Sequence, residues 1–239
     1  MYQMPWRIVR ARVIVRHVTQ TMRGTDKELQ TTVTEELLYT PSIDATGVQV
    51  QARDGTVTLS GEVASLPERL AAERAAMRVR GVKAVQDKLA VHTSSAASAS
   101  DDDIARAAGS LLEWAVDVPA NAVQAGVRDH KITLSGSVTW EYQRDAAARA
   151  VMYIKGVTGI DNKISLNQPA PAAGTKAAVE AAMLRNAQLD ARQITVDVSG
   201  SELTLHGTVG SWAEHRQAGY TAWAATGVTS VRNDLLVKS

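Results

Sequence analysis

The chain has 239 residues without cysteine or phenylalanine, and its 26 basic and 25 acidic side chains leave a formal net charge of +1. The lack of cysteine excludes a disulfide framework, a thiolate metal site and a thiol nucleophile. The near-neutral charge argues against a nucleic-acid partner, which usually requires a strongly basic domain. No apolar run approaches the ~20 residues that span a bilayer.

Residues 1–24 carry five arginines and no acidic residue. Arg10, Arg12 and Arg16 interrupt the apolar stretch 8–18, so it lacks the continuous apolar core of a signal peptide. We therefore expect a disordered extension, with Met22 as an alternative start, and a cytoplasmic location. The alternatives are a basic arm that binds anionic lipid or nucleic acid, and a periplasmic location.

A strand-like segment occurs three times, as VTLSGEV from Val57, ITLSGSV from Ile132 and LTLHGTV from Leu203. Its glycine recurs after 75 and then 71 residues, a distance that lets each copy hold a small core of its own. We expect an extension, three units and two linkers, with the bounds 1–24 for the extension, 25–92 for unit 1, 93–100 for a linker, 101–167 for unit 2, 168–174 for a linker and 175–239 for unit 3.

Each unit opens with an amphipathic helix and continues with a hairpin. In unit 1, Leu29, Val33 and Leu37 share one helix face, and Asp26 is the expected N-cap. Three aspartates from Asp101 begin the helix of unit 2, where one would cap it and the others favour its positive end. The hairpin turns are expected at 54–55, 129–130 and 200–201.

The repeated segment itself is predicted to be the second strand, with a glycine on its inward face. Such a glycine lets a helix lie close to the sheet, or marks a bulge. The next helix is expected at 67–79, 141–154 and 212–225, and a glycine-valine pair follows each copy, where a helix C-cap is typical. The structural glycines are therefore Gly61, Gly136, Gly207, Gly81, Gly156 and Gly227.

The last strand of each unit carries a poor strand former, Asp87, Asn162 or Asn233. A local backbone hydrogen bond or a polar ligand contact would explain it. The predicted fold is α+β, with three tandem αββαβ units, each a three-stranded mixed sheet with two helices on one face.

The Val-x-Leu-x-Gly-x-Val strand, the Gly-Val pair and the closing Asp/Asn-x-Leu/Ile together resemble the BON domain family, over residues 25–238. The resemblance implies the αββαβ fold, no catalytic residues, and a role in osmotic stress, transport or phospholipid-membrane binding. It also implies two alternatives, a potassium-binding sensor and a holdase-like periplasmic chaperone. No other cofactor and no metal site are expected.

No residue set suggests catalysis, because the five histidines form no ligand spacing and no nucleophile or phosphate-binding motif occurs. We predict a non-enzymatic protein that binds a phospholipid surface or a protein partner, with self-association as a further possibility. The expected contact residues lie at the start of the second helix of units 2 and 3: Trp140, Tyr142, Arg144, Trp212 and His215. Aromatic residues there could enter a lipid interface or pack on a neighbouring unit.

Overall fold

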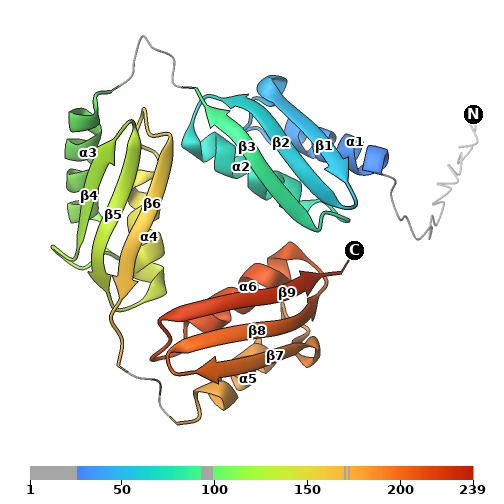
Figure 1. The fold of residues 1–239 in the computed structure, drawn as a ribbon, viewed down its shortest axis with the longest axis vertical. Coiled ribbons are helices and arrows are strands. Elements are labelled where there is room, and N and C mark those ends of the chain that lie inside the picture. The colour runs from blue at the N-terminus through green and yellow to red at the C-terminus, as the bar shows by residue number, and fades with distance from the viewer. Residues whose placement is uncertain (1–25, 93–98, 170, 172, 239) are drawn as a thin grey trace, which may run out of the picture.

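A computed structural model describes residues 26–92, 99–169, 171 and 173–238 (Figure 1). The predicted extension 1–24 and residues 93–98 of the first predicted linker lie outside the described residues. Within the described part, each unit runs helix, strand, strand, helix, strand, which confirms the predicted order.

The elements of the three units correspond one to one. Unit 1 contains α1 (Asp26–Tyr39), β1 (Val48–Arg53), β2 (Thr56–Val63), α2 (Leu66–Arg78) and β3 (Ala84–Val91). Unit 2 contains α3 (Asp101–Trp114), β4 (Val123–Arg128), β5 (Lys131–Val138), α4 (Glu141–Val151) and β6 (Gly159–Leu166). Unit 3 contains α5 (Thr175–Arg185), β7 (Ile194–Ser199), β8 (Glu202–Val209), α6 (Trp212–Trp223) and β9 (Ser230–Val237).

The sheets are mixed, as predicted. In unit 1, β2 pairs antiparallel with β1 and parallel with β3, and the other two sheets repeat this order. The hairpin joins the antiparallel pair, and the second helix makes the crossover that parallel strands require.

The core lies between each sheet and its two helices. The predicted helix face of unit 1, Leu29, Val33 and Leu37, is buried against Val57 and Leu59 of β2. The equivalent positions of units 2 and 3 are buried as well, and the apolar ones among them belong to the core clusters of their own units. Alternation along β2 then leaves its threonines and serine on the opposite face of the sheet.

The turns of the hairpins fall at the predicted positions. Asp54 and Gly55 have φ values of 52° and 82°, and Asp129 and His130 have 50° and 62°. Two consecutive positive φ values match the type I′ turn, which suits the twist of the flanking strands.

The strand glycine is required by backbone rather than by a helix, which corrects the first of the two explanations given above. Gly136 has φ 132°, and a Cβ there would collide with the carbonyl oxygen of Ala122. That oxygen accepts a hydrogen bond from Ser137 N at 3.2 Å. Gly61 and Gly207 repeat the conformation and the close approach, so the glycine marks a local distortion at the start of the outer strand.

The second set of glycines lies beyond the helix ends, not at the C-caps. Helix α2 ends at Arg78, and Gly81 occupies the third position of a turn closed by the Val82 N–Val79 O hydrogen bond of 3.3 Å. Its φ of 94° is the value that a type II turn needs there. Gly156 and Gly227 stand in the equivalent turns.

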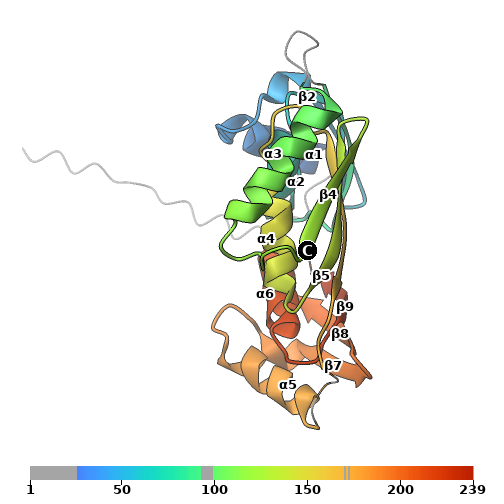
Figure 2. The same ribbon diagram turned by 90° about the vertical axis from the view of Figure 1, so that its left-hand side faces the viewer.

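The three units are arranged as a flat ring. In Figure 1 the strands of all three units lie in front of their helices, and α2, α4 and α6 lie nearer the centre than α1, α3 and α5. After a quarter turn, α3 and α5 lie to one side of their strands (Figure 2). One side of the ring therefore presents sheets and the other presents helices.

Candidate functional site

The start of each second helix is fixed by a side chain one turn into the helix. Glu68 is buried, and its two carboxylate oxygens accept hydrogen bonds from Asp44 N and Ala64 N, both at 2.7 Å. In unit 2, Gln143 accepts from the backbone of residues 139 and 140, and in unit 3 Glu214 accepts from Gly210 N. These contacts fix the direction in which each helix start points.

A second pair of equivalent positions ties this helix to the last strand. Arg69 Nε lies 2.7 Å from Asp87 Oδ2, which anchors the arginine within unit 1. In unit 2 the amide of Asn162 donates to the carbonyl oxygen of Arg144 at 3.1 Å, and Asn233 does the same for His215 at 2.9 Å. The two asparagines therefore bond to the helix backbone where Asp87 forms an ion pair, and the amide of Asn233 also lies 3.4 Å from Nδ1 of the His215 ring. The side chain of Arg144 makes no such contact with Asn162 and pairs with Glu141 instead.

The remaining hydrogen bond of these strand residues is local. The side-chain oxygens of Asp87, Asn162 and Asn233 accept from the backbone N–H two residues later, at 2.9 to 3.4 Å. Of the two explanations above, the structure shows the backbone hydrogen bond.

The helix starts contact the next unit in the ring. Leu66 and Leu70, at the start of α2, pack into the core cluster of unit 2. The guanidinium of Arg144, on α4, lies 5.1 Å from the ring centre of Trp223 in unit 3. Trp212, at the start of α6, donates its Nε1–H to the carbonyl oxygen of Val82 in unit 1 at 3.0 Å.

The three contacts form a head-to-tail cycle, from unit 1 to unit 2, to unit 3 and back to unit 1. We call them the first, second and third junctions. Their chemistry differs, because the first is apolar, the second a cation–π contact and the third a hydrogen bond from an indole. Only the third joins units that are not consecutive in the chain.

Two titratable groups lie at the junctions. Burial raises the pKa of Glu141 against the opposing effect of Arg144 at 2.6 Å, and its second carboxylate oxygen has no hydrogen-bond partner among the described residues. Burial lowers the pKa of His215, whose ring contacts Trp212 in a tilted arrangement with 4.8 Å between centroids and 54° between planes. Both pKa shifts follow from the partial burial of these helix starts.

The predicted contact residues therefore divide into two groups. The structure brings Arg144, Trp212 and His215 into junctions or onto junction residues. Trp140 is half-buried at the start of α4, and Tyr142 remains 55% exposed. Of the alternatives left open by the sequence, packing on a neighbouring unit describes Trp212 directly.

A different set of apolar side chains is exposed, at and just beyond the ends of the first helices. Tyr39 and Trp114 occupy equivalent positions and are 84% and 83% exposed; Val116 is 98% exposed, and Leu184 of α5 is 70% exposed. The sequence contained a signal for them, because Tyr39 and Trp114 each follow the last buried residue of the helix by two positions and so leave the buried face.

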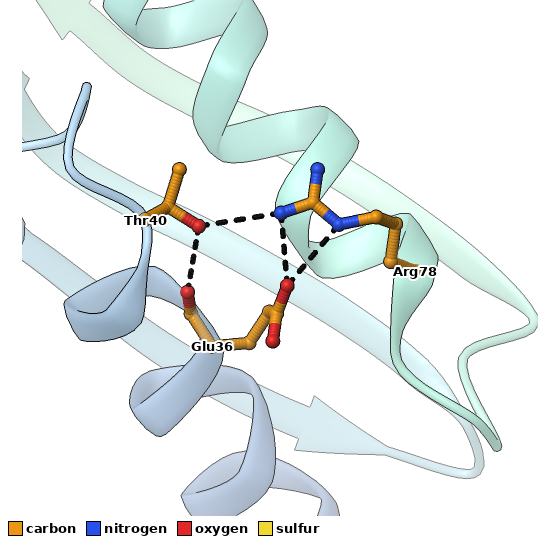
Figure 3. A network of polar contacts seen from close by, with 3 residues as sticks. All are labelled: Glu36, Thr40 and Arg78. Atoms are coloured by element: carbon orange, nitrogen blue, oxygen red, sulfur yellow. Dashed lines mark hydrogen bonds and ion pairs between the residues drawn. The ribbon is translucent and has the colours of Figure 1, made fainter.

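The end of α1 is held firmly behind Tyr39. Arg78 at the end of α2 donates from Nε and from one terminal nitrogen to Glu36 Oε1 at 3.1 and 2.8 Å, and Thr40 joins the same network (Figure 3). Tyr39 therefore projects from a fixed helix end and not from a free loop.

The aspartates that begin α3 serve the fold. Ser100, and not an aspartate, is the N-cap, and it exchanges hydrogen bonds with Asp103. Asp101 accepts from the backbone N–H groups of Asp129 and His130 at 2.8 and 2.9 Å, which lowers its pKa. Asp101 thus connects the helix start to the hairpin turn.

The described residues contain neither a metal-binding cluster nor a membrane-spanning helix. No group of three or more His, Asp or Glu side chains in this part of the chain could hold a metal ion. Within the same residues, no helix is both long and apolar enough to cross a membrane.

Comparisons with known proteins bear on the whole chain. A model of the BON domain matches residues 25–93, 100–168 and 172–239. Osmotically-inducible protein Y of Escherichia coli K12 is 30% identical over 115 residues, which cover 45% of this chain and 57% of that protein. The cytoplasmic location predicted above finds no support in these comparisons.

Solved structures with lower similarity include CdsD, a structural protein of the type III secretion system of Chlamydia trachomatis, and the PrgH periplasmic domain. The first is 15% identical with a TM-score of 0.25, covering 86% of this chain and 90% of that one. The second is 14% identical with a TM-score of 0.21, covering 86% and 99%. At these scores neither carries an inference about function. The three family matches span nearly all of the sequence, and the chain belongs to the BON domain family.

Proposed function

We propose that this chain is a non-enzymatic BON protein that binds phospholipid membrane surfaces through the exposed ends of its first helices. The observation that carries the proposal is the exposure of Tyr39 and Trp114 at equivalent positions, together with Val116 and Leu184. An aromatic side chain at the same exposed position of two units supports an interaction site at these helix ends, because Tyr and Trp are enriched at interfaces.

The chemistry of these ends suits a lipid interface. Trp and Tyr concentrate where the hydrocarbon of a bilayer meets its headgroups, because their rings are apolar and carry one polar group. In Figure 2 the end of α3 points away from the sheets, and the shared fold of the units gives α1 and α5 the same relation to theirs. Three weak contacts on one side of a ring gain avidity when they engage together.

The charges near these ends favour insertion of apolar side chains over attraction to anionic lipid. Glu35 and Glu36 precede Tyr39, while Glu113 and Asp117 flank Trp114. We therefore expect binding to neutral phosphatidylcholine as well as to anionic vesicles. A role under osmotic or other stress is part of the proposal and is supported by the osmotically inducible relative.

Co-sedimentation of the full chain with phosphatidylcholine vesicles tests the proposal. At about 25 cal/mol per Å², burial of about 60 Å² of the Trp114 indole contributes about 1.5 kcal/mol, or roughly tenfold in affinity. Trp114→Ala should therefore weaken binding about tenfold, and Tyr39→Ala somewhat less.

Tyr220→Ala is the matched control, because Tyr220 is 58% exposed on α6 and lies outside the set. Equal binding by the native chain and the Tyr39→Ala/Trp114→Ala double variant would refute the assignment of these residues. Absence of vesicle binding by the native chain would refute the function.

A further inference from the structure

The side of the ring opposite the helices consists of the outer faces of three sheets (Figures 1 and 2). Strand alternation places short polar side chains there, such as Thr133, Ser135 and Thr204. The charged residues of this face differ between the units.

Units 2 and 3 carry opposite charges at equivalent positions of this face. The first residue of the central strand is Lys131 in unit 2 and Glu202 in unit 3. Along the last strand, Asp161 and Lys163 of β6 correspond to Arg232 and Asp234 of β9.

The inversion gives the two faces opposite net charges. The strands of unit 2 place Arg128, Lys131 and Lys163 against Asp161 on this face, which gives +2. Those of unit 3 place Asp197, Glu202 and Asp234 against Arg232, which gives −2. The ring thus has a basic and an acidic sheet side by side.

Some of these charges are balanced locally and others are not. Lys163 pairs with Asp161 at 3.1 Å, Arg232 with Asp234 at 2.8 Å, and Asp197 with Lys176 of α5 at 3.5 Å. Lys131 and Glu202 make no ion pair with any other described residue. These two side chains are therefore available to a partner.

We propose that this face binds a second copy of the chain, sheet to sheet, with unit 2 of each copy facing unit 3 of the other. A two-fold axis parallel to the plane of the ring places the two copies in this way. The basic sheet of each copy then faces the acidic sheet of the other, and the same contact occurs twice, as an isologous dimer requires. Nucleic acid or an anionic membrane would instead meet the acidic face of unit 3. The dimer leaves the exposed ends of the first helices on its two outer sides.

The sheets of units 2 and 3 together offer about the area of a standard protein interface. Each sheet has strands of six, eight and eight residues. At about 3.3 Å per residue and about 4.8 Å between strands, the two sheets cover roughly 700 Å². A standard protein interface buries about 800 Å² per partner. Because the contact is polar and charged, salt should weaken it, with screening over about 10 Å at 0.1 M.

Sedimentation equilibrium of the full chain provides the test. The native chain should be dimeric at low ionic strength and shift to monomer as salt is added. Lys131→Glu and Glu202→Lys should each remain monomeric at concentrations where the native chain is dimeric. The double variant should dimerise, because the charge exchange restores complementarity.

Mixing the two single variants gives the sharpest result. In the proposed dimer, one pair of facing sheets would be native and the other would have exchanged charges, so a heterodimer should form although neither variant self-associates. Lys27→Glu, which makes the same change of charge on α1, is the matched control and should dimerise normally.

A native chain that is monomeric at low salt would overturn the proposal, as would dimers unaffected by Lys131→Glu or mixtures that stay monomeric. These outcomes are distinct from failure of the lipid contact, because Lys131 and Glu202 lie on the other side of the ring.

Discussion

Removal of the Trp212 side chain should open the ring between units 3 and 1. Its Nε1 lies 3.0 Å from the carbonyl oxygen of Val82, across 130 residues of sequence. The first and second junctions join consecutive units, whose linkers keep them close in any case. The third junction has no such tether, so its own contacts must hold it.

The magnitude follows from the two contributions of the indole. The net free energy of one hydrogen bond is about 1 kcal/mol. Truncation of a fully buried Trp to Ala costs about 3–5 kcal/mol, and because Trp212 is half-buried we expect roughly half of that for the whole side chain. Trp212→Ala should thus weaken closure by about 1.5–2.5 kcal/mol. Trp212→Phe should weaken it by about 1 kcal/mol, because it removes the donor but keeps an aromatic ring at this position.

The natural absence of cysteine makes the assay direct. Gln30→Cys in unit 1 and Ala177→Cys in unit 3 change exposed positions of α1 and α5, away from the sheet face, and they can carry a donor and an acceptor dye. Energy transfer between the dyes should fall in Trp212→Ala and fall less in Trp212→Phe. Trp114→Ala, at an exposed Trp outside the junctions, should leave it unchanged.

Unchanged energy transfer in Trp212→Ala would refute the reasoning, because the third junction would then not depend on its central side chain. A drop of equal size in Trp114→Ala would refute it as well, since the effect would not be local to the junction.

Three further changes test the fold and the junctions. Gly136→Ala should destabilise unit 2 by about 2–4 kcal/mol in denaturant unfolding, because it adds the strain of a positive φ to a collision with the Ala122 carbonyl. The same substitution at Gly126, where a Cβ meets nothing within 4 Å, should have little effect. Arg144→Met should cost about 1–3 kcal/mol, because it leaves the buried carboxylate of Glu141 unpaired, and adding Glu141→Gln should recover part of the loss. Burial lowers the pKa of His215, so near its ordinary pKa the unfolded chain binds more protons than the folded one, and stability should fall as the pH drops below about 6.5. The melting temperature of His215→Gln should fall less over that range. Equal falls in melting temperature for the native chain and the variant would contradict this.

The fold of each unit was predictable because its signals are local. Leu29, Val33 and Leu37 identify a helix face from spacing alone, and Asp54-Gly55 specifies a hairpin turn from backbone preference. The role of Gly136 was not predictable, because the atom that excludes a Cβ belongs to Ala122, at the start of another strand. A repeated glycine reveals that space is short but not what fills it.

The candidate sites were predictable only in part, since they depend on how units meet. The sequence drew attention to Trp212 and His215 but could not distinguish a lipid from a neighbouring unit, because the same exposed helix start suits both. The structure places Trp212 against the neighbouring unit, because its indole donates to the carbonyl oxygen of Val82, 130 residues away in the sequence. A backbone acceptor so distant in the sequence leaves no signal near Trp212. The exposure of Tyr39 and Trp114 was predictable, because their spacing from Leu37 and Leu112 places them off the buried helix face.

The distribution of constant and variable positions suggests why three units share one chain. The core strand and the turn glycines are alike in all copies, as a common fold demands. The helix starts differ, with Leu66, Glu141 and Trp212 at one position. Three residues later, units 1 and 2 have Arg69 and Arg144, and unit 3 has His215. If the three helix starts were identical, each could contact any unit, including a unit of another molecule. Three different junctions instead favour one cyclic order of the units. Divergence at the junctions therefore favours closure of the ring within one chain, and it leaves the sheet face and the helix ends free for the second copy and the lipid surface that we propose.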